Sequence, residues 1–157
     1  MTGTPFPDRS GFRFFTPLKV RFNETDLQGH VNFGQFYFYF DVGLTEYMDA
    51  IGYSYMQLLA DNSDLIYAES HCNYRSPARW PETLRIYARL GSMGRRSLRF
   101  EFEARAEPED RLVADGHIVA IVVGRGGFDP APIPNGLRQA AEAFEDRTFD
   151  GDPSARA

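Results

Sequence analysis

The sequence predicts an α+β domain in which an antiparallel sheet of about five strands packs against one long helix. Two patterns lead to this fold class. Apolar residues recur at helical spacing between Asn32 and Ile51, which indicates an amphipathic helix. Apolar and charged residues alternate along 84–90 and 98–105, which is typical of an antiparallel pair of strands with one wet face.

The first elements follow directly from these patterns. A strand is expected over 14–22, with Val20 and Phe22 on the same face. Asn32 is a suitable N-cap for the long helix, and Gly52 is a suitable residue for its C-terminal end. The apolar face of this helix consists of Phe36, Phe40, Leu44, Tyr47, Met48 and Ile51.

Further strands and a short helix complete the predicted order. Pro77 and Pro81 separate the second strand from the third. The strands are expected over 64–74, 84–90, 98–105 and 111–123 as a meander, and the helix over 135–146. Such a sheet leaves a long edge, so we expect the edges to pair in a dimer.

Length and composition limit the possible functions. The 157 residues suffice for one domain, expected over 13–147, with flexible tails over 1–12 and 148–157. The net charge of −5 argues against a nucleic-acid partner. Cys72 is the single cysteine, which excludes an intrachain disulfide. Neither a membrane span nor a secretory signal is recognisable, so we expect a cytoplasmic protein without a membrane partner.

The segment 20–36 carries the most chemical information. Asp26 lies in a polar turn just before the long helix, beside N–H groups that a helix leaves unpaired at its N-terminus. Those donors and the positive end of the helix dipole can hold an oxyanion. A carboxylate in this place indicates acyl hydrolysis. From the residues alone, an Asp that only stabilises its turn is an equal alternative.

Three motifs in the same order resemble the hotdog-fold acyl-CoA thioesterases of the 4-hydroxybenzoyl-CoA thioesterase type. They are Asp26-Leu27-Gln28-Gly29-His30-Val31-Asn32, Tyr74-Arg75-Ser76-Pro77-Ala78 and Gly94-Arg95-Arg96-Ser97. The resemblance implies a sheet wrapped around the helix and a homodimer or homotetramer with active sites at the subunit interface. It also implies hydrolysis of an acyl-CoA to free acid and CoA, without metal or organic cofactor.

The resemblance assigns roles to single residues. Asp26 becomes the catalytic acid, either as a nucleophile that attacks the thioester carbonyl or as a general base for water. The backbone N–H of Phe33, with Gly34 beside it, becomes the oxyanion site. His30 is a candidate donor to the thioester carbonyl, and Asn32 is a candidate substrate contact. Both residues also have simple structural interpretations in the turn.

A basic turn provides candidates for binding the CoA phosphates. Arg95 and Arg96, followed by Ser97, suit this role because guanidinium groups bind phosphate through paired donors. Arg75 and Arg79 are weaker candidates for the same role, and simple solvation of these arginines is the alternative.

The remaining acids and possible metal ligands have simpler interpretations. Glu24 is expected to be solvated or to bind within its turn. Asp41 is the second candidate for the catalytic acid, or else a structural acid that bonds to a partner subunit. His71, His117 and Cys72 form no recognised metal-ligand spacing, so no metal site is expected.

Two rival functions remain on the same fold. Hotdog enoyl hydratases and dehydratases use an Asp and a His along the helix and its approach, but the predicted helix contains no His. A non-catalytic acyl-CoA binder would need no acid beside the helix, although a fold does not fix a function. The acyl group stays open between aryl, short and medium chains, and the carrier between CoA and acyl carrier protein.

Overall fold

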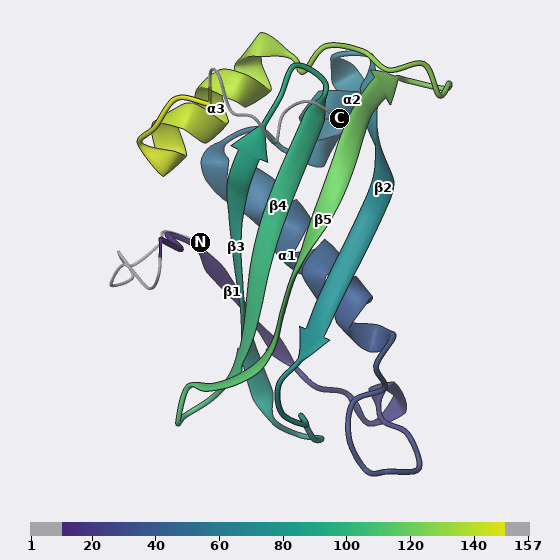
Figure 1. The fold of residues 1–157 in the computed structure, drawn as a ribbon, viewed down its shortest axis with the longest axis vertical. Coiled ribbons are helices and arrows are strands. Elements are labelled where there is room, and N and C mark those ends of the chain that lie inside the picture. Colours follow the sequence, from purple (N-terminus) through teal and green to yellow (C-terminus); the bar gives the residue numbers. More distant parts are fainter. Residues whose placement is uncertain (1–10, 150–157) are drawn as a thin grey trace.

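The computed structural model describes residues 11–149 and confirms the predicted α+β class, with one long helix and one antiparallel sheet (Figure 1). The described elements are β1 (Phe15–Lys19), the 3-10 turn η1 (Phe22–Glu24), α1 (Gln35–Ile51), α2 (Tyr55–Ala60), β2 (Ser63–Tyr74), β3 (Thr83–Met93), β4 (Ser97–Ala106), β5 (Arg111–Gly124) and α3 (Asn135–Glu145).

The five strands form a single sheet in the order β1-β3-β4-β5-β2. β3, β4 and β5 form the expected meander. The prediction that β2 also belongs to this meander is wrong, because β2 pairs with β5 at the far side of the sheet. Alternation of apolar residues shows which face of a strand is buried, but it does not identify the neighbouring strand. β2 is therefore a long edge strand.

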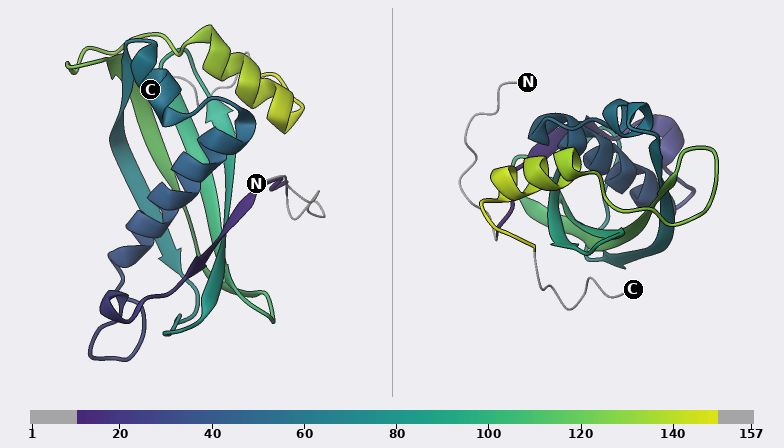
Figure 2. Two further views of the ribbon diagram at one scale, coloured as in Figure 1. Left: turned by 180° about the vertical axis from the view of Figure 1, so that it is seen from behind. Right: turned by 90° about the horizontal axis from the view of Figure 1, so that it is seen from above.

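The sheet curves around α1, as the hotdog resemblance implies (Figure 2). The predicted apolar face of α1 is buried from Phe36 to Met48. Phe40 stacks on Phe102 of β4, with ring centroids 4.9 Å apart. A Cβ atom at Gly43 would lie 2.7 Å from the side chain of Ile86, so the glycine allows the helix to approach β3 closely.

The chain before α1 differs from the prediction. β1 ends at Lys19, and although Val20 is fully buried, Phe22 is 73% exposed. The two residues therefore do not share a buried face, because the 3-10 turn η1 replaces the end of the expected strand. α1 begins at Gln35 with Gly34 as its N-cap, three residues later than the start expected at Asn32.

The last elements close one end of the molecule. α3 is predicted correctly to within one residue, whereas the short helix α2 is missing from the prediction. Phe12 and Phe149 are both buried, just outside the range 13–147 expected for the domain. The expected tails otherwise fall on 1–10 and 150–157, outside the described residues. No helix within 11–149 is long and apolar enough to cross a membrane.

Candidate active site

The Asp26 turn is a closed loop held by its own main chain. An isolated β-bridge joins Thr25 to Val31. The N–H of Asp26 donates to the carbonyl oxygen of His30 at 3.0 Å, and the N–H of Gly29 donates to that of Asp26 at 2.9 Å. Gly29 has a φ of +81°, a conformation that side-chain-bearing residues rarely adopt. The sequence therefore builds a rigid loop immediately before α1.

This loop holds the Asp26 carboxylate with one oxygen engaged. Asp26 Oδ1 accepts the N–H of Gln28 at 2.9 Å, which is the side-chain turn that Asp commonly forms. Within the described chain no hydrogen bond reaches Oδ2, and the residue is half-buried. The turn-stabilising interpretation and the catalytic one are thus compatible, because one oxygen orients the group and the other is available.

Glu24 has a structural role instead. It is 6% exposed, and its Oε1 accepts the N–H of Arg21 at 2.8 Å and the hydroxyl of Tyr39 at 3.0 Å. Its Oε2 accepts from the Arg21 guanidinium and, at 3.3 Å, from the side chain of Gln35. The expectation of a turn ligand is confirmed, and that of a solvated group is wrong. Burial and the bond to Glu24 raise the pKa of the Tyr39 hydroxyl.

The main chain between the loop and α1 presents a free donor. Asn32 is not the N-cap, but its Oδ1 accepts the N–H of Gly34 at 3.0 Å and its carbonyl oxygen accepts the N–H of Gln35. Among the residues that the structure describes, the N–H of Phe33 has no acceptor. Phe33 therefore has the available N–H expected of it, whereas the N–H of Gly34 is occupied.

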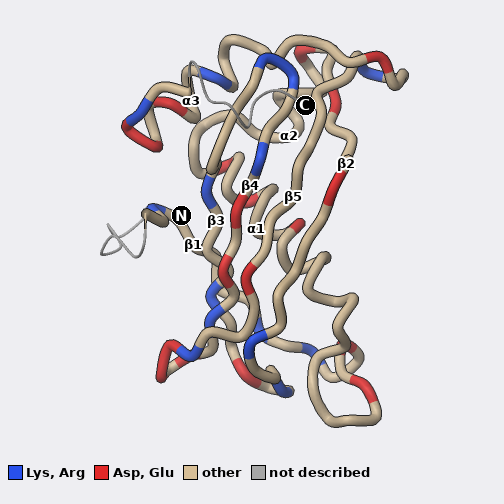
Figure 3. The backbone as a smooth tube through the Cα atoms, in the orientation of Figure 1, with Lys and Arg blue, Asp and Glu red and all other residues tan. Residues whose placement is uncertain are grey.

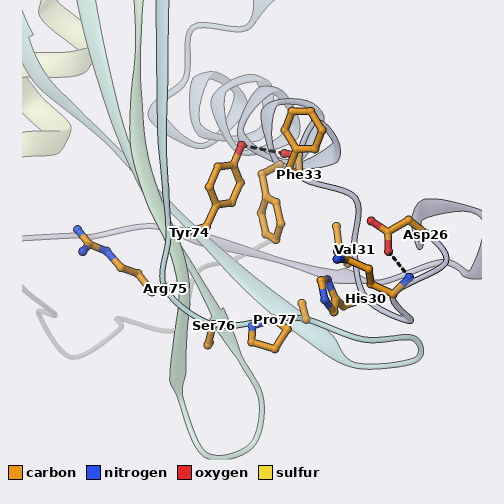
Figure 4. Close-up of a pocket in the computed structure, with 11 residues that line it drawn as sticks. Asp26, His30, Val31, Phe33, Tyr74, Arg75, Ser76 and Pro77 are labelled. Atoms are coloured by element: carbon orange, nitrogen blue, oxygen red, sulfur yellow. Dashed lines mark hydrogen bonds between the residues drawn. The ribbon is translucent and has the colours of Figure 1, made fainter.

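A cavity of about 420 Å³ lies beside this segment and brings three of the predicted site residues together, whereas Asn32 and Gly34 do not line it (Figure 4). Asp26, His30 and Phe33 line it from the loop and the segment that precedes α1. The other side is formed by the last residue of β2, Tyr74, and the connection that follows it, which together carry the second sequence motif. Its apolar lining includes Val31, Phe36, Tyr74, Pro77 and Ala78.

The sequence assigns Tyr74 no role in the site, because its motif is identified only through the resemblance. Phe36 belongs to the predicted apolar face of the long helix. Tyr74 is 49% exposed and packs edge-on against Phe36, with ring centroids 5.7 Å apart. The Tyr74 motif identifies a segment that lines the cavity. That the end of β2 lies beside the start of α1 follows only from the order of the strands in the sheet.

The candidate phosphate ligands do not meet at this cavity. The turn between β3 and β4, which carries the exposed Arg95 and Arg96 and leads into the buried Ser97, lies at the opposite end of the molecule (Figure 3). Arg75, ranked lower from the sequence, does line the cavity, and its Nε donates to Asp115 at 2.9 Å. Of the candidate phosphate ligands, Arg75 is therefore the one that lines the cavity with Asp26.

Asp41 and the possible metal ligands lie elsewhere. The hydroxyl of Tyr67 on β2 donates to Asp41 Oδ1, so Asp41 is bonded within its own chain. The rings of His71 and His117 stack, with centroids 5.4 Å apart. Across 11–149, no group of three or more His, Cys, Asp or Glu residues is arranged to hold a metal ion.

Comparison with known proteins places these features in context. A family model described as the thioesterase-like superfamily matches residues 20–141. The uncharacterized protein YsmA of Bacillus subtilis (strain 168) is 29% identical over 101 residues, which cover 62% of this chain and 65% of that protein.

Two solved structures share the fold over most of the chain. A thioesterase from Thermus thermophilus, complexed with coenzyme A and Zn, is 27% identical with a TM-score of 0.74, covering 88% of this chain and 99% of its own. The DHNA-CoA thioesterase of Staphylococcus aureus is 20% identical with a TM-score of 0.76, covering 84% of this chain and 88% of its own.

Proposed function

This chain belongs to the thioesterase-like superfamily of hotdog proteins, and on that premise we propose that it hydrolyses an acyl-CoA thioester to a free acid and CoA. One observation supports the proposal most strongly. A carboxylate with an available oxygen, on Asp26, and an unoccupied main-chain donor, on Phe33, border the same cavity.

The chemistry has two balanced routes. In the first, Asp26 Oδ2 attacks the thioester carbonyl, the C–S bond breaks and CoA leaves as a thiolate, and water then hydrolyses the mixed anhydride. In the second, Asp26 takes a proton from water, whose oxygen attacks the carbonyl while the proton finally reaches the departing thiolate. In both routes the Phe33 N–H stabilises the negative charge that develops on the carbonyl oxygen.

The cavity suits an apolar acyl group at its centre. Aromatic rings from Phe33, Phe36 and Tyr74 border it, and aromatic or aliphatic acyl chains bury apolar surface against such rings. Arg75 also lines the cavity, but its guanidinium is paired with Asp115, so we assign it no role in holding the acyl group. The proposal therefore includes aryl, short and medium acyl groups.

We further propose that the active unit is a homodimer or a homotetramer. β2 is an edge strand, and an unpaired edge of this length favours pairing with another strand. Phe38 and Val42 of α1 are 67% and 39% exposed, and Tyr67 of β2 is 45% exposed. Within one chain, Arg95, Arg96 and Ser97 lie too far from the cavity to bind a CoA held there. In such an assembly, they can bind the CoA that occupies the cavity of a neighbouring subunit.

Thiol release from a panel of acyl-CoAs tests this function directly. The panel should contain aromatic, short, medium and long acyl groups, each also offered on acyl carrier protein. We expect turnover of CoA esters with aromatic or shorter acyl groups. Binding of these esters without any thiol release would contradict hydrolysis and favour a non-catalytic acyl-CoA binder.

A further inference from the structure

The segment 74–78 contacts the chain between Asp26 and α1 at two points. The carbonyl oxygen of Ala78 accepts the N–H of Val31 at 2.8 Å. The hydroxyl of Tyr74 donates to the carbonyl oxygen of Phe33 at 3.0 Å, as the dashed line in Figure 4 shows. This second contact joins a side chain from the edge strand β2 to the residue whose N–H is the proposed oxyanion donor.

Hydrogen bonds fix both peptide groups that flank Phe33. The first of these peptide groups joins the carbonyl of Asn32 to the N–H of Phe33. Its carbonyl oxygen accepts the N–H of Gln35 at 3.0 Å. In the following peptide, the N–H of Gly34 donates to Asn32 Oδ1 and the Phe33 carbonyl oxygen accepts from Tyr74. The bond from Tyr74 is the member of this set that comes from outside the turn.

We infer that Tyr74 is a positioning residue for the proposed hydrolysis, because its hydroxyl holds the Phe33 main chain in the orientation that presents the Phe33 N–H to the thioester oxygen. The inference rests on the proposed function. A donor that is already oriented needs no reorganisation when charge develops, so loss of this tether should weaken the transition state more than the bound substrate.

The chemistry of Tyr74 suits a permanent donor. Partial burial, together with the neighbouring Cys72, raises the pKa of the Tyr74 hydroxyl to about 12, so it remains protonated at any ordinary assay pH. The ring itself packs against Phe36. Tyr74→Phe therefore removes the donor and preserves the ring contact.

Tyr55→Phe is a matched control for this substitution. Tyr55 lies on α2, and its hydroxyl also donates to another element, to Asp64 Oδ1 of β2 at 2.6 Å, but neither residue lines the cavity. With the acyl-CoA that wild type hydrolyses best, Tyr74→Phe should lower kcat about tenfold and leave KM and the melting temperature nearly unchanged. Tyr55→Phe should leave kcat within about twofold of wild type.

A vibrational measurement separates positioning from a loss of folding. In the Asp26→Asn background, the C=O stretch of the bound thioester should lie below its value in solution, because the Phe33 N–H polarises it. Adding Tyr74→Phe should return this stretch towards the solution value, and adding Tyr55→Phe should not.

Two outcomes separate the role of Tyr74 from the proposed thioester hydrolysis. Wild type that hydrolyses no thioester would overturn the proposed function and the inference together. Turnover that collapses in Asp26→Asn, combined with a Tyr74→Phe variant that keeps wild-type kcat and an unchanged carbonyl stretch, would overturn the role of Tyr74 alone.

Discussion

At the scale of single residues, Glu24 and Asp26 show how two nearby acids acquire different roles. Glu24 is saturated by donors from Arg21, Gln35 and Tyr39, whereas Asp26 keeps an available oxygen beside the cavity. The resemblance selects Asp26, which lines the cavity. It does not reveal why Glu24 is structural, because Tyr39 reaches Glu24 from the second turn of a helix whose exact start the sequence misplaces.

Replacement of Glu24 by Ala should destabilise the protein by about 2–3 kcal/mol, because the hydroxyl of Tyr39 and the N–H of Arg21 lose their acceptor. Urea denaturation measures this loss in the free energy of unfolding, with Glu46→Ala at an exposed position of α1 as the control. Equal stabilities for the two variants would contradict the structural role of Glu24.

Cys72 should be dispensable for turnover. Burial raises the pKa of its thiol to about 11, so little thiolate, the nucleophilic form, exists near neutral pH. We therefore expect Cys72→Ala to keep kcat within about twofold of wild type. A loss comparable with that of Asp26→Asn would instead assign the nucleophile to Cys72.

At the scale of elements, helical spacing predicted α1 and α3 well, and it failed where a polar contact decides the boundary. α1 begins at Gln35 although Asn32 Oδ1 accepts the N–H of Gly34, the bond expected of an N-cap side chain, because Asn32 and Phe33 stay outside the regular helix. The short helix α2 is capped by Ser54, whose side chain accepts the N–H of Gln57 at 3.0 Å. That serine was the available signal for α2.

The contact between α1 and α3 contains a buried acid. Glu145 is 8% exposed and its Oε1 accepts the hydroxyl of Tyr47 at 2.7 Å. Burial raises the pKa of Glu145, and the bond from Tyr47 only partly opposes this effect. As pH rises from the pKa of the unfolded chain to the raised pKa of the folded one, the unfolded state ionises first, so stability falls across this window.

Glu145→Gln should therefore gain stability relative to wild type as pH increases. The free energy of unfolding of the variant, minus that of wild type, should be larger at about pH 7 than at about pH 4. The reason is that the variant has no carboxylate to ionise at this position. Denaturation at the two pH values checks the sign. A difference that does not change with pH would contradict the buried-acid account.

At the scale of the whole molecule, the order of strands is what the sequence could not provide. Local patterns predicted every strand, but the pairing of β2 with β5 depends on contacts between distant segments. That pairing places Tyr74 beside Phe33 and completes the cavity. Arg95 and Arg96 lie in the turn at the far end of β3, away from the Asp26 loop (Figure 3).

Phe38→Glu should shift the protein towards monomer if the exposed faces of α1 and β2 form the subunit interface. Phe38 is 67% exposed on α1, and a buried charge there would be costly in a dimer. Phe128→Glu, at an 83% exposed loop position, is the matched control. Sedimentation equilibrium measures both variants, and an unchanged mass for Phe38→Glu would exclude this face as the interface.

The central claim is that the available carboxylate oxygen of Asp26 carries the chemistry. Its most direct test is kcat for wild type, Asp26→Asn and the exposed helix control Asp49→Asn on one acyl-CoA, with binding of the intact thioester measured in parallel. We predict that Asp26→Asn binds the thioester but hydrolyses it at least about 100-fold more slowly, and that Asp49→Asn matches wild type. Wild-type turnover by Asp26→Asn would contradict the claim.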